Sequence, residues 1–227
     1  MFTVSIIKGV FMKRPLMLII SYILILTPGS YQKAFSQELK PIKLVKPDLS
    51  RGKLLMQALK ERKTNRSFSP KELNLDILSN LLWAACGVNR PESGKRTAPT
   101  AVNWQEIDLY VAIKTGVYLY DARKHSLNPA LPQDIREYTG IQAFTNIAPV
   151  YIIYVANFSR MGGNMNDKIF YSAADTGFIS QNVYLFCASE GLATVVLGLV
   201  DKDRLAKIMN LKENQRIILT QPVGYPE

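Results

Sequence analysis

The order of predicted helices and strands in this sequence indicates an α+β fold. A hairpin is expected over residues 107–120, where two strand-like runs flank a short turn that contains glycine. An almost continuously apolar run at residues 149–155 is typical of a strand that is buried on both faces. A long helix is expected from about Asn166 to Glu190. Because strands and helices do not alternate regularly, this class is favoured over a doubly wound sheet.

The composition is that of one globular domain of ordinary size. The chain has 227 residues, of which 48% are hydrophobic and 20% are charged, so it holds enough apolar matter for a core. Its 2 cysteines are too few for a small domain framed by disulfides. The 28 Lys and Arg residues outnumber 18 Asp and Glu residues, and this net charge of +10 raises the question of a polyanionic partner.

The N-terminal segment differs from the rest of the chain, because its basic residues are accompanied by no acidic ones: Lys8, Lys13, Arg14 and Lys33. An apolar run at residues 17–27 precedes Pro28 and a small-x-small site that ends at Ser36. This order is typical of a signal peptide. Residues 1–36 are therefore predicted to direct export, to the periplasm in a bacterium, with Met12 as an alternative start. The competing interpretation is a membrane anchor over residues 17–27, and the chain after residue 36 carries a net +6, from 24 basic and 18 acidic residues.

One domain is predicted over residues 51–227, after a polar linker or arm at residues 37–50. Ser50 is the expected N-cap of a first helix, whose apolar face would be Leu54, Leu55, Ala58 and Leu59. A second helix is expected to begin near Leu75 and to end at Gly87. Residues 88–105 are expected to form a long polar loop, and loops of that length are often functional.

The elements expected after the hairpin are less regular. Residues 129–147 are predicted as a short helix and loop. Residues 193–197 have the composition of a strand, and Asp201 is the expected cap of a short helix that reaches Asn210. A last strand is expected over residues 215–224.

Cysteine and histidine chemistry is not indicated. Cys86 and Cys187 lie in apolar helical contexts and are predicted to be small buried hydrophobes, although a disulfide between them stays open in an oxidising compartment. His125 lies in a polar turn and is interpreted as a surface histidine. With no CxxC motif and a single histidine, no metal site is expected.

Three segments carry side chains or backbone groups that suit a ligand. Arg62, Lys63, Thr64 and Arg66 follow the first helix and would suit a phosphate, although such a run is often a solvated surface. The segment 96–105 offers amides and hydroxyls that suit the polar edge of a heterocycle, or ordinary turn chemistry. The apolar run at 191–200 ends a strand at Gly198, where a planar ligand could approach the backbone.

Together these segments resemble the motifs of the nitroreductase family of FMN flavoproteins, in particular its SagB-type dehydrogenase branch. The matching stretches, in chain order, are Arg62-Lys-Thr-Asn-Arg66, Leu81-Leu-Trp-Ala-Ala-Cys-Gly87, Ala98-Pro-Thr-Ala-Val-Asn-Trp-Gln105, Gly116 to Leu127, Ala173 to Asn182, Gly191 to Gly198 and Val223 to Pro226. The resemblance implies an α+β fold with a central, mostly antiparallel sheet flanked by helices. It also implies a homodimer with FMN bound across its interface.

The resemblance assigns the site residues in three groups. The phosphate and ribityl chain would be held by Arg62, Lys63, Thr64 and Arg66. The partner subunit would contribute Pro99, Thr100, Ala101 and Asn103, and the ring would be lined by Val196, Leu197 and Gly198. A backbone N–H near Leu197 or Gly198 would donate to flavin N5, so no catalytic side chain is expected.

Two departures from the family pattern stand out. Family members often carry a cation after the last strand, whereas no Lys or Arg follows Arg216 here. Two alternatives follow: a lower affinity for FMN, or substitution of this cation by Lys95 or Arg96. Lys63 also stands where Arg is common, which keeps the charge but loses the two-pronged hydrogen bonding of a guanidinium.

The resemblance implies an FMN-dependent oxidoreductase that passes electrons from a donor such as NAD(P)H to a nitroaromatic, a quinone or a similar small acceptor in a ping-pong mechanism. The alternative is an exported flavin-binding carrier or sensor without turnover. A basic module for nucleic acid is a weaker alternative, because the cations cluster at residues 60–66 and no nucleic-acid-binding motif is found.

Overall fold

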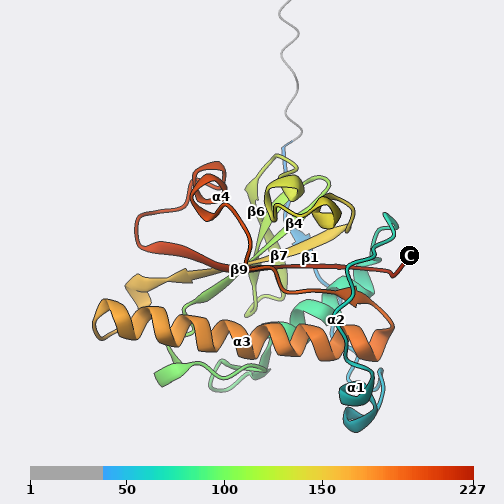
Figure 1. Ribbon diagram of the computed structural model, residues 1–227. Coiled ribbons are helices and arrows are strands. Elements are labelled where there is room, and N and C mark those ends of the chain that lie inside the picture. Colours follow the sequence, from blue (N-terminus) through green and yellow to red (C-terminus); the bar gives the residue numbers. More distant parts are fainter. Residues whose placement is uncertain (1–37) are drawn as a thin grey trace, which may run out of the picture. The chain divides into compact units, whose positions relative to one another are not determined.

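The computed structural model describes residues 38–227 of the chain (Figure 1). The predicted signal peptide at residues 1–36 lies outside the described residues. Within residues 38–227, no helix is both long enough and apolar enough to span a bilayer.

A 7-stranded sheet forms the centre of the fold, in the order β1-β6-β5-β4-β7-β9-β8. Every pair of neighbouring strands in it is antiparallel. The strands are β1 (Ile42–Lys43), β4 (Ile107–Ile113), β5 (Gly116–Asp121), β6 (Ser126–Leu131), β7 (Val150–Asn157), β8 (Ala193–Thr194) and β9 (Gln215–Gly224). A separate 2-stranded sheet pairs β2 (Val88–Arg90) with β3 (Lys95–Arg96). The α+β prediction is confirmed.

The central strand β7 explains the continuous apolar run in the sequence. It lies between β4 and β9, and its residues from Val150 to Ala156 are buried. The side chains of one face join a core beneath the sheet and those of the other face join a second core above it. A strand covered on both faces needs apolar residues at every position rather than at alternate ones.

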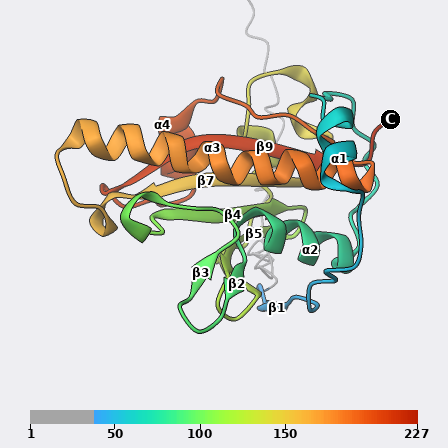
Figure 2. The ribbon, with the colours of Figure 1, turned by 90° about the horizontal axis from the view of Figure 1, so that it is seen from below.

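Helices cover both faces of the sheet (Figures 1 and 2). On one face lie α2 (Leu75–Cys86) and α3 (Met165–Glu190), with α1 (Leu55–Glu61) beside the C-terminal end of α3. The other face carries α4 (Lys202–Ile208) and the 3-10 turns η2 (Arg136–Tyr138) and η3 (Ala143–Asn146). Two further 3-10 turns, η1 (Ala101–Asn103) and η4 (Phe158–Arg160), flank the strands β4 and β7.

The long helix α3 has clear signals at both ends. The Asn164 side chain accepts from the Asp167 N–H at 3.0 Å, and the Asp167 carboxylate accepts from the Asn164 N–H at 3.2 Å, which forms a capping box. Gly191 ends the helix with a left-handed φ of 69°. The expected span of 166–190 is confirmed.

The first helix differs from its prediction. It begins at Leu55, and Ser50 does not cap it but donates its hydroxyl to Asp48. Of the four residues expected on an apolar face, only Ala58 is buried, whereas Leu54 and Leu55 are 81% and 62% exposed. The helical spacing was recognised correctly, but the apolar face points away from the core of this chain.

Two stretches for which no strand was predicted contain strands in the structure. The loop at 88–105 begins with the β2–β3 hairpin, and the segment at 129–147 begins with the end of β6. Pro129 argues against a strand, but it pairs with Tyr118 next to an irregularity in the register. The two-residue strand β1 pairs only with Ser126 and Leu127, so no neighbour requires a donor from Pro129.

The segment at residues 38–50 is an arm that packs on the domain. Leu44 is buried, and the Val45 N–H donates to the Ser79 hydroxyl at 2.9 Å. His125 lies with Nε2 2.9 Å from the Val45 carbonyl and Nδ1 2.9 Å from the Tyr120 hydroxyl. Burial lowers the pKa of His125, so the neutral ring donates from Nε2 and accepts at Nδ1. His125 is therefore a structural contact for the arm.

Candidate functional site

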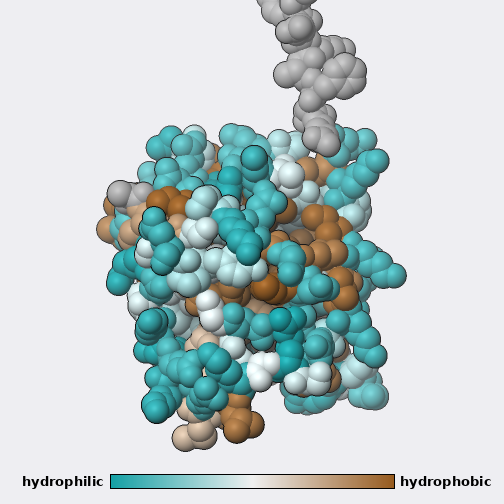
Figure 3. All heavy atoms as spheres, turned by 90° about the vertical axis from the view of Figure 1, so that its right-hand side faces the viewer, coloured by the Kyte–Doolittle hydropathy of each residue, from teal (hydrophilic) through white to brown (hydrophobic). Residues whose placement is uncertain are grey.

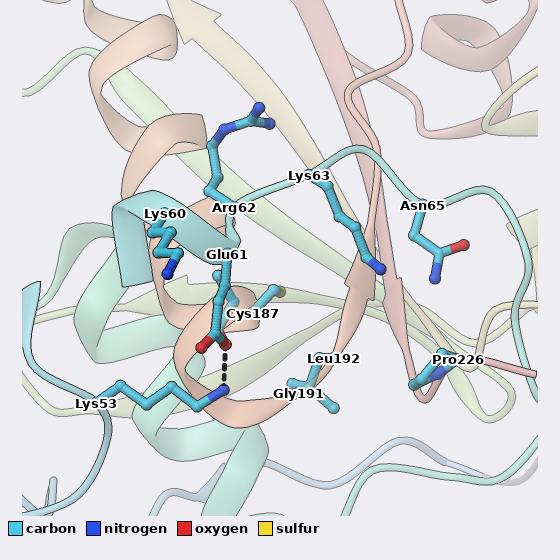
Figure 4. Close-up of a pocket in the computed structure, with 11 residues that line it drawn as sticks. Lys53, Lys60, Glu61, Arg62, Lys63, Asn65, Cys187, Gly191, Leu192 and Pro226 are labelled. Carbon is cyan, nitrogen blue, oxygen red and sulfur yellow. Dashed lines mark hydrogen bonds and ion pairs between the residues drawn. The ribbon is translucent and has the colours of Figure 1, made fainter. Parts of the chain in front are cut away.

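The predicted phosphate-binding residues lie on an extended segment after α1. The Asn65 N–H donates to the carbonyl of Thr194 in β8 at 3.0 Å, so the segment runs along this edge of the sheet. Successive side chains of an extended chain point to opposite sides. In Figure 4 the side chain of Arg62 points away from the pocket, whereas Lys63 points down toward Asn65.

Arg62 and Thr64 both contact Tyr184 on α3. The Arg62 guanidinium lies 5.4 Å from the centre of the Tyr184 ring, and the Thr64 hydroxyl is 3.2 Å from the Tyr184 hydroxyl. The same hydroxyl accepts the Val196 N–H at 3.0 Å. Tyr184 therefore connects the basic segment to the segment that precedes Gly198. No local pattern indicates this role, because Tyr184 fits the helical pattern of α3 as one more partly buried aromatic residue.

Lys63 lines a pocket of about 520 Å³ between α1, the end of α3 and the C-terminus (Figure 4). Lys53 and Lys60 also line it, and Lys53 pairs with Glu61 at 2.5 Å. Hence the predicted ligands do not all converge on one point. Arg62 also lines the pocket, but its guanidinium and the Thr64 hydroxyl contact Tyr184, whereas the Lys63 side chain points down from the segment in Figure 4.

The cations of this segment have no acidic partner within residues 38–227. The ion pairs there join Arg51 to Glu190, Lys53 to Glu61, Arg136 to Asp134 and Arg160 to Asp108. None of them involves Arg62, Lys63 or Arg66. Positive charges that no carboxylate of the described chain neutralises are free to bind an anion such as a phosphate.

The backbone N–H groups of Leu197 and Gly198, both predicted as donors to the ring, differ in whether they are already hydrogen-bonded. Leu197 and Thr220 exchange two backbone hydrogen bonds, of 2.8 and 3.1 Å, so the Leu197 N–H is already used. The Gly198 N–H has no acceptor among the described residues, and Gly198 is exposed. Among residues 38–227, a Cβ atom added there would meet only Leu219, at 3.8 Å, so no described side chain fills this position. Of the two candidates, only Gly198 has a free donor.

The predicted polar loop has an unusual backbone. Val102, Asn103 and Gln105 have φ values of 50°, 59° and 48°, which non-glycine residues rarely adopt. The Thr100 hydroxyl accepts the Gln105 N–H at 3.0 Å, and the Ala101 N–H donates to the Asp175 carboxylate on α3 at 2.9 Å. The β-branched side chain of Val102 is 83% exposed. Side chains elsewhere in the fold therefore hold this loop in a shape that its own sequence disfavours.

Arg96 supports this loop rather than the basic segment. Its Nε donates to the Gln105 side chain at 3.0 Å, and a terminal nitrogen lies 3.3 Å from the Cys86 sulfur. In this subunit Arg96 thus contacts the polar loop and α2, and the idea that it replaces the missing C-terminal cation stays a prediction. Lys95 lies on β3 in the same hairpin.

The two cysteines are buried free thiols, as predicted. Burial raises the pKa of both Cys86 and Cys187, so neither is a ready nucleophile. The disulfide left open by the sequence does not form in this structure.

The sequence and fold both match one family. Its model, described as "Nitroreductase family", matches residues 59–225. A protein of Methanocaldococcus jannaschii that is named as a nitroreductase is 32% identical over 189 residues, which cover 78% of this chain and 93% of that protein. The chain therefore belongs to the nitroreductase family.

Solved structures share the fold. A crystal structure from Ralstonia eutropha, of a protein named as a nitroreductase, is 41% identical and superposes with a TM-score of 0.80, covering 85% of this chain and 91% of that chain. The E. coli microcin synthetase McbBCD complex is 19% identical with a TM-score of 0.64, covering 89% of this chain and 83% of that one. Because its identity is only 19%, the likeness to the McbBCD complex concerns the fold alone.

Family membership makes the chain an FMN-dependent oxidoreductase. The described residues fit such a cofactor. Cations without acidic partners suit a phosphate, and an exposed glycine with a free N–H suits the close approach of a flat ring. When bound, FMN supplies the hydride and electron transfer. The resemblance to the SagB-type branch stays a prediction.

Proposed function

We propose that two copies of this chain form a homodimer and that each flavin site takes residues from both. The support is a set of large apolar side chains that the single chain leaves exposed on α1, α3 and the polar loop: Leu54, Leu55, Met56, Leu59, Val102, Ile169, Phe170 and Phe178. Figure 3 shows apolar side chains at the lower edge of a mostly hydrophilic face, at the level of α1. A set of this size is typical of a protein interface.

The positions of the two binding segments along α3 support a shared site. The polar loop bonds to Asp175, and the basic segment contacts Tyr184, which lies about 13 Å further along the helix. A second copy would bring its own polar loop to the basic segment of the first. We therefore keep Pro99, Thr100, Ala101 and Asn103 as contributions of the partner's loop.

In the proposed site, Arg62, Lys63, Thr64 and Arg66 bind the phosphate and ribityl chain, and Val196, Leu197 and Gly198 line the ring. The observation that carries this proposal is the unused Gly198 N–H, which the Tyr184 contacts connect to the basic segment. Gly198 would donate to the ring edge, while the cations neutralise the phosphate. These groups position and polarise the cofactor, and no side chain is assigned an acid or base role.

The reaction we propose is ping-pong transfer from a donor such as NAD(P)H to a nitroaromatic, a quinone or a similar organic acceptor. Donor and acceptor would occupy the same space beside the exposed Gly198 in turn. Leu199, which follows Gly198, is 59% exposed, and Ile141 is 62% exposed. Ile141 follows Gly140, where an added Cβ would lie 3.0 Å from the Leu197 side chain. Exposed apolar side chains of this kind suit a planar aromatic molecule.

The test is anaerobic mixing of the purified FMN-loaded protein with NADPH or NADH, followed by a quinone. We expect the flavin absorbance to bleach with a donor and to return with the acceptor. A flavin that no donor reduces would favour a carrier without turnover. Sedimentation of the same sample measures the mass, and a monomer that binds FMN tightly would overturn the shared site.

We also propose that residues 1–36 direct export and are removed, which leaves Gln37 as the first residue. The support is the sequence order described above, and the segment lies outside the described residues. Mass spectrometry of the protein from cell fractions tests this. A protein that starts at Gln37 in the exported fraction is expected, and an intact N-terminus in the membrane fraction would favour the anchor over residues 17–27.

A further inference from the structure

Glu106, at the start of β4, is a fully buried acid without a hydrogen-bond donor. Its exposed fraction is 0%, and neither carboxyl oxygen meets a donor in the described residues. Buried carboxylates are almost always paired or hydrogen-bonded, because desolvation of an isolated charge is costly. The group beside it is the carboxyl of Asp175 on α3, which is only 2% exposed.

Two neighbouring carboxylates are both acceptors, so a hydrogen bond between them requires a proton on one. Burial is the main cause that raises the pKa of Glu106, and together with the neighbouring Asp175 carboxyl it brings the pKa to about 7. The opposing cation is Arg160 on η4, but it already donates to the Gln105 carbonyl at 2.7 Å and to Asp108.

The remaining groups near Glu106 do not supply the missing donor. Cys86 on α2 is a neighbour of Glu106, and burial raises the pKa of its thiol. Arg96 on β3 donates to Gln105 and to Cys86 instead. Among the described residues, Glu106 has no donor for its carboxyl oxygens, so a proton on Glu106 would allow its carboxyl to pair with that of Asp175.

The acid pair lies where the polar loop is attached. Asp175 accepts the Ala101 N–H at 2.9 Å at one end of the loop, and Arg160 donates to the Gln105 carbonyl at 2.7 Å at the other. Between them lie the positive φ values of Val102 and Asn103. Each such residue costs on the order of 1–3 kcal/mol and persists only when its surroundings hold it.

We propose that Glu106 carries a proton, donates it in a hydrogen bond to Asp175, and thereby positions the loop 101–105 for flavin binding. Both acids are positioning residues, because they act through the loop and do not touch the ring. The inference rests on the proposed role of Pro99, Thr100, Ala101 and Asn103 in the flavin site. The new element is that flavin binding requires a proton on Glu106, which lies outside the flavin site itself.

The decisive variant is Glu106→Gln, because an amide donates to Asp175 at every pH. The binding of FMN and of riboflavin is measured by flavin fluorescence between about pH 6 and about pH 8.5. Riboflavin lacks the phosphate, so its affinity does not follow phosphate ionisation. We expect the wild-type affinity for both ligands to fall about tenfold as the pH rises, the equivalent of one pKa unit. The variant should show no such fall.

Asp175 supplies a rescue test. Asp175→Asn keeps an oxygen for the Ala101 N–H and gains an amide donor for Glu106, so it should bind flavin within about threefold of the wild type. Asp175→Ala loses both contacts and should bind about tenfold more weakly at all pH values. Asp121→Asn is the matched control, since Asp121 accepts the N–H groups of Arg123 and Lys124 in a turn of another hairpin.

Infrared spectroscopy of the cofactor-free protein gives a readout that a purely structural role would not move. A protonated carboxyl band should be present in the wild type at pH 6, disappear as the pH rises and be absent from Glu106→Gln. An identical pH dependence in the wild type and Glu106→Gln, or no carboxyl band in the wild type, would overturn the inference. A wild-type protein that binds no flavin at any pH would instead overturn the proposed site.

Discussion

The basic segment at residues 62–66 and the polar loop at residues 100–105 suit a ligand in opposite ways. The basic segment is extended, largely exposed and rich in cations that no acid of the described chain neutralises. The polar loop carries no charge, and its backbone has an unfavourable shape that Asp175 and Arg160 hold. The first segment therefore depends on charge, which the sequence displays, and the second depends on conformation, which buried groups elsewhere determine.

The largest expected effect is on the loop side and concerns folding. Glu106→Gln should remove a pH dependence of the free energy of unfolding on the order of 3 kcal/mol, because the pKa of Glu106 rises from 4.5 to about 7 on folding. Below about pH 4.5 both states hold the proton. Between about pH 4.5 and about pH 7 only the folded state keeps the proton on Glu106, so the wild type loses stability as the pH rises. Above about pH 7 the loss is complete.

Denaturant unfolding at several pH values measures this difference. As the pH rises from about 4.5 to about 7, the free energy of unfolding should fall in the wild type and stay level in Glu106→Gln, so the two curves diverge. Parallel curves over this range would show that Glu106 ionises alike in both states. A protonated Glu106 would then not be what holds the loop.

On the charge side, Arg62→Ala should weaken FMN binding by about 10- to 100-fold, since a hydrogen bond to a charged group contributes about 1.5–3 kcal/mol. Riboflavin affinity should change far less, because riboflavin has no phosphate. Arg204→Ala is the matched control, as the Arg204 guanidinium lies 4.7 Å from the Tyr138 ring in a similar cation–π contact. Equal losses for FMN and riboflavin would contradict the phosphate role.

Tyr184→Phe tests the connection between the basic segment and the ring-lining segment. The variant keeps the ring under Arg62 but leaves the Val196 N–H without its acceptor. We expect about a fivefold weaker affinity for FMN, corresponding to about 1 kcal/mol. Tyr225→Phe is the control, because Lys71 lies 4.5 Å from that ring in a comparable contact. A titration of each apo-protein with FMN measures the effect, and identical affinities would remove Tyr184 from the site.

The smallest effect should come from Val102→Gly. Glycine adopts the positive φ of 50° without strain, which should stabilise the fold. Glycine also loses more chain entropy on folding, which offsets part of this gain. We therefore expect the variant to be more stable by at most about 1 kcal/mol. Val45→Gly, at a position without positive φ, should destabilise by about 0.5–1 kcal/mol. Thermal unfolding compares the pair, and equal destabilisation would show that the loop is not strained at Val102.

The sequence predicted the features that a local pattern determines. The strand at 215–224 and the helix that ends at Gly191 match the structure, because alternation, capping residues and glycine act within a few neighbouring residues. The basic segment was visible for the same reason, since its charges are adjacent in the chain.

Features that depend on distant partners were not predictable from one sequence. Nothing near Glu106 or Asp175 in the chain shows that the two acids meet, and Tyr184 looks like any partly buried helical aromatic residue. Residues 129–147 are predicted as a short helix and loop, yet a short neighbouring strand lets Pro129 remain in β6. The apolar face of α1 was recognised, but a pattern of this kind does not tell whether it packs on its own core or on another molecule.

The strand order has a practical consequence. β1, which is part of the arm, forms one edge of the sheet, and β8, along which the basic segment runs, forms the other. The start of the described chain is therefore separated from the basic segment by the full width of the sheet. A tag, fluorescent label or surface linker attached ahead of residue 38 would leave the basic segment accessible, so immobilised protein should suit the flavin-binding measurements described above.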